Sequence, residues 1–486
     1  MSNKIYPIGI QNFEKIRNDG YFYIDKTALM YQMVKTGIYY FLSRPRRFGK
    51  SLLISTLEAY FQGKKELFEG LAVEKLEKDW IKHPILHLDL NIEKYDTPES
   101  LDKILNDNLE YWESQYGTRP SETSFSLRFA GIIQRACEKT GQRVVILVDE
   151  YDKPMLQAIG NEELQKQFRN TLKPFYGALK TKDGYIKFAL LTGVTKFGKV
   201  SVFSDLNNLD DISMWNEYVE ICGVSEREIH ENLEAELHEF AAARGITYDK
   251  LCEDLRECYD GYHFTHNSIG MYNPFSLLNA FKRKEFGSYW FETGTPTYLV
   301  KLLKKHHYDL ERMAHEETDV QVLNSIDSES TNPIPVIYQS GYLTIKGYDE
   351  EFGMYRLGFP NREVEEGFIR FLLPFYANVN KVESPFEIQK FVREVRSGDY
   401  NSFFRRLQSF FADTTYEVIR DQELHYENVL FIVFKLLGFY TKVEYHTSEG
   451  RIDLVLQTDK FIYIMEFKQM VAPCSAKADA IAKPIP

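Results

Sequence analysis

The 486-residue sequence is poor in cysteine and in long apolar runs, and each shortage argues against a class of protein. Its five cysteines are odd in number and form no CxxC pair, which argues against a disulfide framework and a cysteine zinc site. They are Cys137, Cys222, Cys252, Cys258 and Cys474. No segment approaches the roughly 20 apolar residues of a membrane-spanning helix.

Excess positive charge is also absent, because 71 acidic residues face 59 Lys and Arg, for a net charge of −12. Proteins that coat nucleic acid without sequence preference usually have a basic surface, so that class is disfavoured. A small site that reaches a phosphate through bound metal stays compatible with this charge. The first residues, MSNKIYPIGIQNFEK, lack the basic-then-apolar pattern of a secretory signal. We therefore expect a cytoplasmic protein without a membrane segment.

Short apolar, β-prone runs alternate with helical patterns through the first 200 residues. The predicted strands are 38–42, 84–90, 143–149 and 186–192, and the predicted helices are 51–61, 121–139 and 161–179, the last broken near Pro174. This alternation predicts βαβ units and a mainly parallel, buried sheet. A mostly helical region follows at about 205–285, and short strands are predicted at 342–345 and 354–357. The last part predicts a helix at 426–437, a strand at 440–446 and a hairpin at 451–468.

A basic segment, Arg44-Pro45-Arg46-Arg47-Phe48-Gly49-Lys50-Ser51, lies between the first predicted strand and the first long helix. A phosphate-binding loop needs this placement, because amides at the helix start and the helix dipole both favour an anion. Lys50 would reach the β- and γ-phosphates, and the Ser51 hydroxyl would take one position on Mg²⁺. The standard pattern is G-x-x-x-x-G-K-[ST], and Arg44 stands at its first glycine. Taken alone, the tripeptide Gly49-Lys50-Ser51 is equally compatible with a basic loop that ends at the start of a helix.

Two carboxylates, Asp149 and Glu150, end the third predicted strand, 99 residues after Lys50. An acid at this place holds Mg²⁺ through water in P-loop proteins, and the adjacent Glu can orient or deprotonate the attacking water. The carboxyl ends of parallel strands lie at the sheet edge where a P-loop also lies, so the two segments should meet. The next strand ends at Thr192, whose hydroxyl could sense the γ-phosphate.

These segments resemble the AAA-ATPase-like proteins, a family abundant in gut and anaerobic bacteria. The resemblance covers about residues 5–285 and rests on 23–27, 44–52, 148–154 and 191–196. The arginine-rich loop is that family's own variant of the P-loop. The resemblance implies that Ser51 and Asp149 serve Mg²⁺, that Glu150 is the catalytic acid, and that ATP is the ligand. The predicted nucleotide site comprises Arg46, Arg47, Phe48, Gly49, Lys50, Ser51, Leu52, Asp149 and Thr192.

The C-terminal hairpin brings two acids and a lysine together. With a two-residue turn at 459–460, Asp453 lies directly opposite Glu466, and Glu466 shares a face with Lys468. Two carboxylates with Cβ atoms about 5 Å apart repel unless a cation lies between them, and Mg²⁺ prefers such oxygen ligands. That metal could activate water at a phosphodiester while Lys468 steadies the developing charge. The alternative is a surface hairpin with ordinary charged decoration.

This D…E-x-K arrangement, preceded by Glu444-Tyr445-His446-Thr447, resembles the PD-(D/E)xK nuclease superfamily and the small nuclease-like domain usually joined to the AAA-like family. The resemblance implies catalytic roles for Asp453, Glu466 and Lys468, metal ligation by the two acids, and Glu427 or Glu444 as a further acid. The fold normally continues beyond the lysine with a helix and further strands. Here the chain ends 18 residues later, in a Pro/Ala-rich tail, which leaves the completeness of the domain open.

The expected organisation has four parts. They are an AAA-ATPase-like P-loop domain with a helical extension at 1–285, a linking region at 286–374, a PD-(D/E)xK nuclease-like domain at 375–470 and an atypical tail at 471–486. Two functions stay open. The first is a Mg²⁺-dependent ATPase coupled to a nuclease-like domain that acts on DNA or RNA. The second is a regulatory or interaction module that binds ATP without turnover and has an inactive nuclease-like domain. No feature fixes the oligomeric state.

Overall fold

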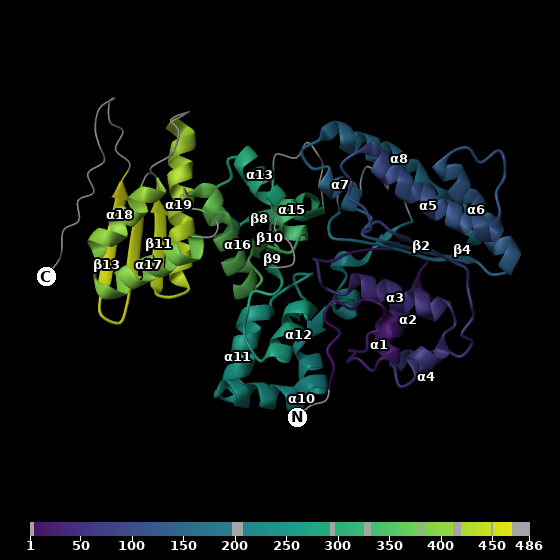
Figure 1. Cartoon of the computed structure of the whole chain (residues 1–486), viewed down its shortest axis with the longest axis horizontal. Helices are drawn as coiled ribbons and strands as arrows, with labels where there is room; N and C mark the ends of the chain where they lie inside the picture. Colours follow the sequence, from purple (N-terminus) through teal and green to yellow (C-terminus); the bar gives the residue numbers. More distant parts are fainter. Residues whose placement is uncertain are drawn as a thin grey trace. The chain divides into compact units, whose positions relative to one another are not determined.

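The chain forms two compact units (Figure 1). The computed structural model describes residues 4–196, 208–291, 297–324, 332–377, 380, 383–411, 419–448 and 451–468. The first unit comprises Met1–Tyr308 with Arg312–Gly367, and the second comprises Asp309–Glu311 with Phe368–Pro486. The predicted tail at 471–486 lies outside the described residues. In the described part of the chain, no helix combines the length and apolar character that crossing a bilayer requires.

The first unit is built on a five-stranded parallel sheet with the strand order β2-β3-β4-β1-β5. Its strands are β1 (Tyr39–Ser43), β2 (Ile85–Asp89), β3 (Val144–Asp149), β4 (Ile186–Gly193) and β5 (Asp210–Asp211). Strands β1 and β3 are buried along their whole length, as expected for a sheet covered on both faces. The predicted parallel, buried α/β sheet is confirmed, with the four predicted strands displaced by no more than one residue at either end.

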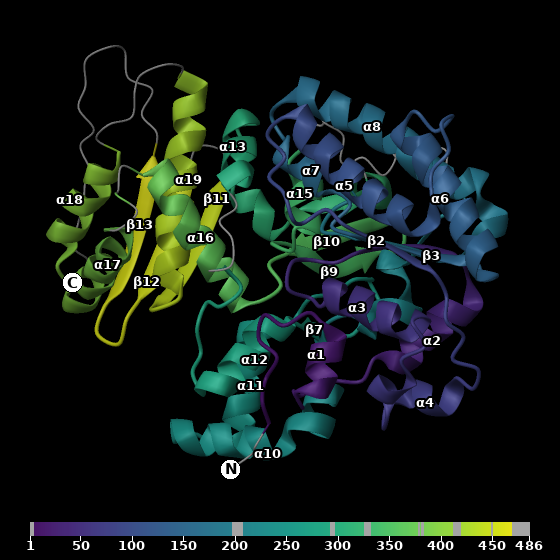
Figure 2. The same ribbon diagram turned by 45° about the vertical axis from the view of Figure 1, so that its right-hand side comes forward.

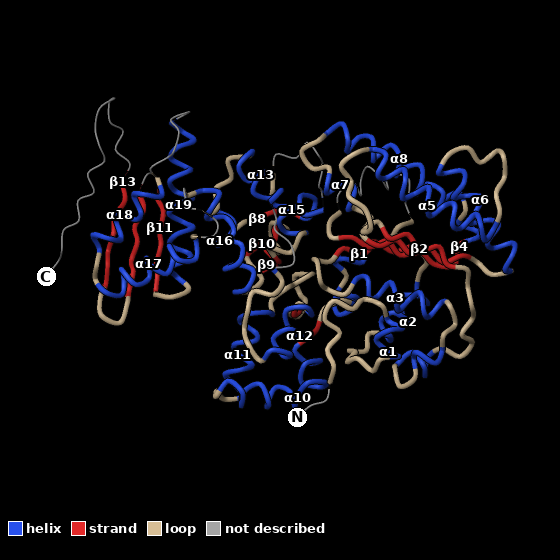
Figure 3. The backbone as a smooth tube through the Cα atoms, viewed as in Figure 1, coloured by secondary structure: helices blue, strands red, loops and turns tan. Residues whose placement is uncertain are grey.

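Helices cover both faces of this sheet (Figure 3). One face carries α5 (Pro98–Tyr116), α6 (Phe125–Thr140) and α8 (Glu162–Thr181), and the other carries α1 (Phe13–Asn18), α2 (Thr27–Thr36), α3 (Lys50–Phe61) and α4 (Ala72–Leu76). A short helix, α7 (Lys153–Gln157), connects β3 to α8. Because α3 begins directly after the loop that follows β1, the sheet edge and the start of this helix meet at residues 44–50.

Helix α8 continues through Pro174, so the predicted break near this residue is wrong. Proline removes one amide hydrogen bond and crowds the preceding turn, which usually kinks or ends a helix. Here Phe168, Leu172, Phe175 and Tyr176 are buried on both sides of the proline. This tertiary packing keeps the helix continuous, because most helical stability in a folded protein comes from burial of an apolar face.

A helical region follows the sheet and has a core of its own. Its elements are η3 (Ile212–Met214), η4 (Asn216–Ile221), β6 (Val224–Ser225), α10 (Glu226–Arg244), α11 (Tyr248–Tyr259), β7 (Met271–Tyr272) and α12 (Pro274–Arg283). Strands β6 and β7 pair in antiparallel fashion. The core of the region includes Leu233, Phe240, Leu251, Tyr259 and Leu277. The predicted mostly helical stretch is therefore present, with α10 opened by a capping box of Ser225 and Glu228.

The rest of the first unit contains a small antiparallel sheet with the order β8-β10-β9. Its elements are α13 (Thr297–Lys305), β8 (Glu317–Asp319), α14 (Val320–Asn324), α15 (Ile334–Gln339), β9 (Thr344–Asp349) and β10 (Met354–Gly358). The two predicted short strands correspond to β9 and β10, although β9 begins two residues later than predicted. The chain passes into the second unit within helix α16 (Arg362–Tyr376).

The second unit pairs three antiparallel strands, in the order β11-β12-β13, with helices (Figure 2). The elements are α17 (Ser384–Ser397), α18 (Tyr400–Phe410), α19 (Ile419–Gly438), β11 (Lys442–Ser448), β12 (Arg451–Gln457) and β13 (Ile462–Lys468). The Tyr463 hydroxyl donates to the Val395 carbonyl at 2.8 Å, which holds β13 against α17. The predicted hairpin is confirmed, and the predicted helix forms the second half of α19.

Candidate functional site

The candidate phosphate-binding loop connects β1 to α3. Gly49 is the residue that caps the start of α3, and its φ of +97° is a conformation that glycine adopts without the penalty other residues incur. Arg47, two residues earlier, also has a positive φ, +65°. The backbone therefore turns sharply just before the helix. Such a turn is the geometry that lets successive backbone amides converge on an anion.

Lys50 is buried, with only 4% of its surface exposed, and its ammonium group lies among acceptors. The Nζ atom lies 3.1 Å from the carbonyl oxygen of Arg44 and 3.4 Å from that of Pro45. It also lies 3.4 Å from Oε1 of Glu150, at the end of β3. The structure thus brings the lysine and the acid pair to one edge of the sheet, as the order of the elements predicts. A bound phosphate would compete with these three oxygens for the ammonium.

Asp149 is held in one orientation by its neighbours. The Thr192 hydroxyl, on β4, donates to Oδ1 of Asp149 at 2.6 Å, and the Glu150 amide donates to the same oxygen at 3.1 Å. Glu150 has a φ of +53°, which is uncommon for a residue other than glycine and is associated with functional sites. Thr192 therefore acts on Asp149 in this structure, and its predicted contact with a γ-phosphate stays a prediction.

Asp152 belongs to the same site and was missed by the sequence analysis. Its carboxylate is fully buried and accepts hydrogen bonds from the Thr195 amide and hydroxyl, both at 2.6 Å, and from the Val194 amide at 3.2 Å. Burial, with a smaller contribution from the Glu150 charge, raises the pKa of Asp152 to about 6. The signal that could have indicated it is a third acid three residues after Asp149. Asp152 ties the segments that follow β3 and β4 together.

Arg44, at the position of the missing glycine, is a buried anchor for the base of the loop. Its guanidinium donates to the carbonyls of Ser43 at 2.9 Å, Ser213 at 2.8 Å and Tyr218 at 3.1 Å. It also stacks 3.9 Å from the centroid of the Phe264 ring. Burial lowers the pKa of Arg44 to about 10, so the group keeps its charge at neutral pH. The arginine therefore supplies contacts that a glycine in this position could not.

The remaining predicted loop residues differ in exposure. Arg46 and Arg47 are exposed, and the Arg47 guanidinium lies 5.2 Å from the centroid of the Phe275 ring. Phe48 is buried and packs edge-on against Tyr262. Ser51 and Leu52, in the first turn of α3, are half-buried. The loop thus exposes two long cationic side chains, Arg46 and Arg47, to solvent. Its aromatic residue, Phe48, packs into the protein core.

A mainly apolar pocket of about 110 Å³ adjoins the loop. One wall comes from the loop and α3, at 48–49 and 52–53, and a second comes from the N-terminal segment, at 22–24 and Lys26. The third wall comes from the helical region, at 221–224 together with the start of α12. Three parts of the chain that are distant in sequence therefore meet beside the start of α3.

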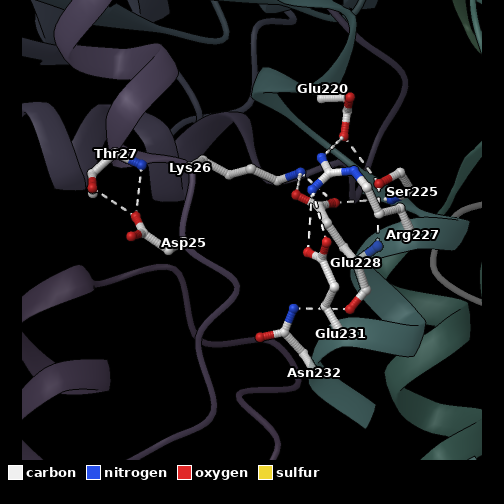
Figure 4. Close-up of polar contacts among 9 residues, drawn as sticks. All are labelled: Asp25, Lys26, Thr27, Glu220, Ser225, Arg227, Glu228, Glu231 and Asn232. Atoms are coloured by element: carbon white, nitrogen blue, oxygen red, sulfur yellow. Dashed lines mark hydrogen bonds and ion pairs between the residues drawn. The ribbon is translucent and has the colours of Figure 1, made fainter. Parts of the chain in front are cut away.

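An ion pair links two of these walls (Figure 4). The Lys26 ammonium lies 2.5 Å and 2.6 Å from the two carboxylate oxygens of Glu228. Glu228 also accepts the Ser225 amide at 2.9 Å in the capping box of α10. On the other side, Asp25 accepts the amide and hydroxyl of Thr27 at the start of α2. The pocket wall is therefore fixed to two helix starts through charged and capping contacts.

In the second unit, the hairpin register places Asp453 opposite Glu466, as predicted from the turn. Two positions along the same register, Arg451 is opposite Lys468, and the sequence analysis had assigned no role to Arg451. Ile464 is 73% exposed, whereas Leu454, on the alternate face of β12, is buried. Positions two apart in a strand share a face, so Ile464 and Leu454 mark opposite faces of this sheet.

The other residues predicted for this second site have a limited description. The side chains of Asp453, Glu466, Lys468 and Glu444 lie outside the described residues, and Glu427 is half-buried on α19. Among the side chains that the structure describes, no group of three or more His, Cys, Asp or Glu is arranged to hold a metal ion. A nucleotide-bound Mg²⁺ needs less, because phosphate oxygens and waters fill most of its positions. Whether Ser51 and Asp149 hold such an ion stays a prediction.

The strand order, the glycine-capped helix and the lysine–acid pairing define a P-loop-like α/β protein, with a nuclease-like hairpin in its second unit. A family model described as a predicted AAA-ATPase matches residues 7–203, and a model of the PD-(D/E)XK nuclease superfamily matches residues 421–482. An uncharacterized protein in the vnfD 5′ region of Azotobacter chroococcum mcd 1 is 35% identical over 482 residues, spanning 96% of this chain and 90% of that protein. The chain belongs to the AAA-ATPase-like family that carries a C-terminal PD-(D/E)XK domain, and both predicted resemblances are confirmed.

Proposed function

We propose that the first unit binds ATP with Mg²⁺ at residues 44–51 and hydrolyses it. One observation carries the proposal: the Lys50 ammonium lies 3.4 Å from Glu150, at the start of a glycine-capped helix and at the carboxyl edge of a parallel sheet. Anion-binding amides, a cation and two carboxylates are the parts that phosphoryl transfer to water requires. Membership of the AAA-ATPase-like family supports the same assignment.

The residues divide the work between binding and chemistry. Lys50 would pair with the β- and γ-phosphates, while Arg46 and Arg47, which are exposed on the loop, add positive charge. Ser51 would hold Mg²⁺ directly, and Asp149 would hold it through water in the orientation that the Thr192 hydroxyl fixes. Once a phosphate competes for Lys50, the Glu150 carboxylate is released to orient or deprotonate the attacking water.

The 110 Å³ pocket is the proposed site for the base of the nucleotide. It adjoins Gly49 and Leu52, so a base bound there would be joined to phosphates at the loop without crossing the sheet. Its mainly apolar lining suits the faces of a purine ring, and apolar pockets with a few polar groups are typical of small-ligand sites. The Lys26–Glu228 ion pair would keep its walls together.

We further propose that the second unit acts on DNA or RNA in the cytoplasm, through Mg²⁺ held by Asp453 and Glu466 with Lys468 beside them. The hairpin register and the match at residues 421–482 support this reading. The domain division at 1–285, 286–374 and 375–470 belongs to the same proposal. The competing candidate is a module that binds ATP without turnover. The Lys50–Glu150 ion pair favours it, because a glutamate that stays paired with the lysine is unavailable as a base.

The test compares wild type with Lys50→Ala and with Lys94→Ala, whose lysine is 77% exposed and lies outside the loop. Calorimetric titration with Mg²⁺–ATP gives the affinity, and release of inorganic phosphate gives turnover. We expect Lys50→Ala to weaken binding at least about tenfold, or 1.4 kcal/mol, and to abolish turnover, with Lys94→Ala unchanged. A folded wild-type protein that does not bind ATP would refute the proposal. Binding without phosphate release would favour the regulatory module.

A further inference from the structure

The carbonyl oxygen of Arg46, in the middle of the proposed P-loop, is held from outside the loop. The indole Nε1 of Trp290 donates to it at 3.0 Å, and the side-chain amide of Asn273 donates to it at 3.3 Å. Trp290 is 4% exposed and Asn273 is 1% exposed. The hydrogen bonds of these two buried side chains therefore depend on the orientation of the Arg46 carbonyl in the loop.

Trp290 makes a second contact through its backbone. Its amide donates to Oε1 of Glu363 at 2.7 Å, and Glu363 is 7% exposed in the first turn of α16. The first residues of this helix belong to the first unit, and from Phe368 onward the helix belongs to the second. One residue thus connects the P-loop backbone to the helix through which the chain enters the nuclease-like unit.

The surroundings of Trp290 are tightly packed. Its ring lies edge-on to Tyr342, with the centroids 5.1 Å apart. The residue before Tyr342 is Gly341, with a φ of +88°, and a Cβ atom there would come within 2.5 Å of the Pro45 side chain. Segment 341–342 therefore contacts both the loop and Trp290. Because close-packed side chains leave little free volume, a displacement of the loop would also shift Trp290.

We propose that Trp290 is a positioning residue that transmits nucleotide occupancy of the P-loop to the first turn of helix α16. The inference rests on the proposed binding of nucleotide phosphates at the loop. A phosphate that draws the Lys50 ammonium away from the Arg44 and Pro45 carbonyls changes the forces on those peptide groups. The next carbonyl, that of Arg46, is the one that holds Trp290.

Movement at Arg46 has a consequence for the buried indole. A buried N–H group that loses its acceptor is strongly disfavoured, so Trp290 must follow the carbonyl or find another partner. Either change alters how the Trp290 amide holds Glu363 and hence the stability of the first turn of α16. The ligand acts on α16 only to the extent that it binds the two loop arrangements with different affinity. The region 286–374, which had no predicted function, supplies the connection.

The experiment measures hydrogen–deuterium exchange in the full-length protein, with and without saturating Mg²⁺ and a non-hydrolysable ATP analogue. In wild type, we expect peptides covering 362–376 to change their exchange rate at least about threefold on binding. Trp290→Phe keeps the aromatic ring but removes the Nε1 donor. It should bind the analogue with an affinity within about threefold of wild type and lose the change in α16. Glu363→Ala, which breaks the other end of the connection, should also lose it.

The matched control is Trp112→Phe, which alters another buried tryptophan, on α5, that is 3% exposed. This variant should keep the nucleotide-dependent change in α16, and calorimetry on each variant establishes binding first. A wild-type protein that fails to bind the analogue would overturn both the proposed function and the coupling. Binding with unchanged exchange at 362–376 would overturn the coupling alone. So would a normal response in both Trp290→Phe and Glu363→Ala.

Discussion

The two candidate sites of this chain are assembled in different ways. In the first unit, each key side chain is fixed by partners on other elements: Thr192 holds Asp149, and Lys50 lies against Glu150. In the second unit, Asp453 and Glu466 are brought opposite one another by the register of a single hairpin. The first arrangement depends on the whole parallel sheet, and the second depends on one local turn. A site of the first kind is preorganised by tertiary structure, whereas one of the second kind needs little more than its hairpin.

The charges of the two sites also differ in pattern. At the first, the cation Lys50 lies between carbonyl oxygens and a carboxylate, so opposite charges are matched within one cluster. At the second, the acidic register pair is followed by a basic pair, Arg451 and Lys468. Diagonal neighbours across strands are close enough for long side chains to interact. The register therefore places two basic residues of the sequence near two acidic ones along the same hairpin.

The largest effect is expected at the first site, on substitution of Glu150. Glu150→Gln removes the proposed base but keeps a side chain of the same shape beside Lys50. We expect ATP turnover to fall about 10²–10⁴-fold, the usual contribution of a general base, while ATP affinity changes little. Steady-state phosphate release and calorimetry measure the two quantities. Glu231→Gln, at a side chain that is 55% exposed on α10, is the control. Turnover that survives in Glu150→Gln would show that the residue has no chemical role.

The next effect tests whether the hairpin site works independently of the first. Asp453→Ala should lower Mg²⁺-dependent cleavage of DNA or RNA by about 10²-fold or more, because it removes a proposed metal ligand. Lys468→Ala should lower it similarly through loss of charge stabilisation. ATP affinity should stay as in wild type for both variants. Cleavage is followed on labelled single- and double-stranded DNA and RNA. If cleavage persists in both variants, the hairpin residues have no catalytic role, and the chain has one candidate site rather than two.

Short sequence patterns correctly predicted strand β3, the hairpin register and the meeting of Lys50 with Glu150, because each depends on interactions that are near in sequence or on a simple topological rule. Strand β3 was recognisable because an apolar run of its length suits only a buried strand or a short buried helix, and acids end it. The hairpin register followed from the turn at 459–460, because the side-chain period of a strand is two. The meeting of Lys50 with Glu150 followed from the rule that parallel strands end at one edge. In each case a short stretch of sequence carries the information.

Contacts between distant segments were beyond such reasoning. Arg44 was identified as an odd residue in a P-loop, but its role as an anchor needs Ser213 and Tyr218, more than 160 residues away in sequence. The bond between Trp290 and the Arg46 carbonyl spans 244 residues. Helix α8 passes Pro174 because its apolar face is buried, and propensity alone predicts a break. Asp152 stands out in the sequence only as a third acid after Asp149, and that spacing does not tell a buried acid from a solvated one.

The smallest expected effect is a pH dependence of stability that belongs to the first unit alone. The pKa of Asp152 is raised to about 6 in the folded protein, against about 3.9 in an unfolded chain. Between these values the folded state binds more protons at Asp152, so the contribution of this group to the free energy of unfolding falls as pH rises from about 4 to 6 and is level above that. One proton sets the limit of this slope at about 1.4 kcal/mol per pH unit.

Tryptophan fluorescence isolates this effect, because the four tryptophans, Trp80, Trp112, Trp215 and Trp290, all belong to the first unit. Urea unfolding is followed at half-unit steps from pH 4.5 to 7.5. Asp152→Asn also disturbs the hydrogen bonds to Thr195 and so lowers stability at every pH, but only the change of slope relative to wild type reports the carboxyl group. Asp96→Asn, at a side chain that is 57% exposed, should keep the wild-type slope. An Asp152→Asn protein with the wild-type slope would mean that the pKa of Asp152 is not raised in the folded protein. The contact between the segments that follow β3 and β4 would then involve no penalty for burying a charged carboxylate.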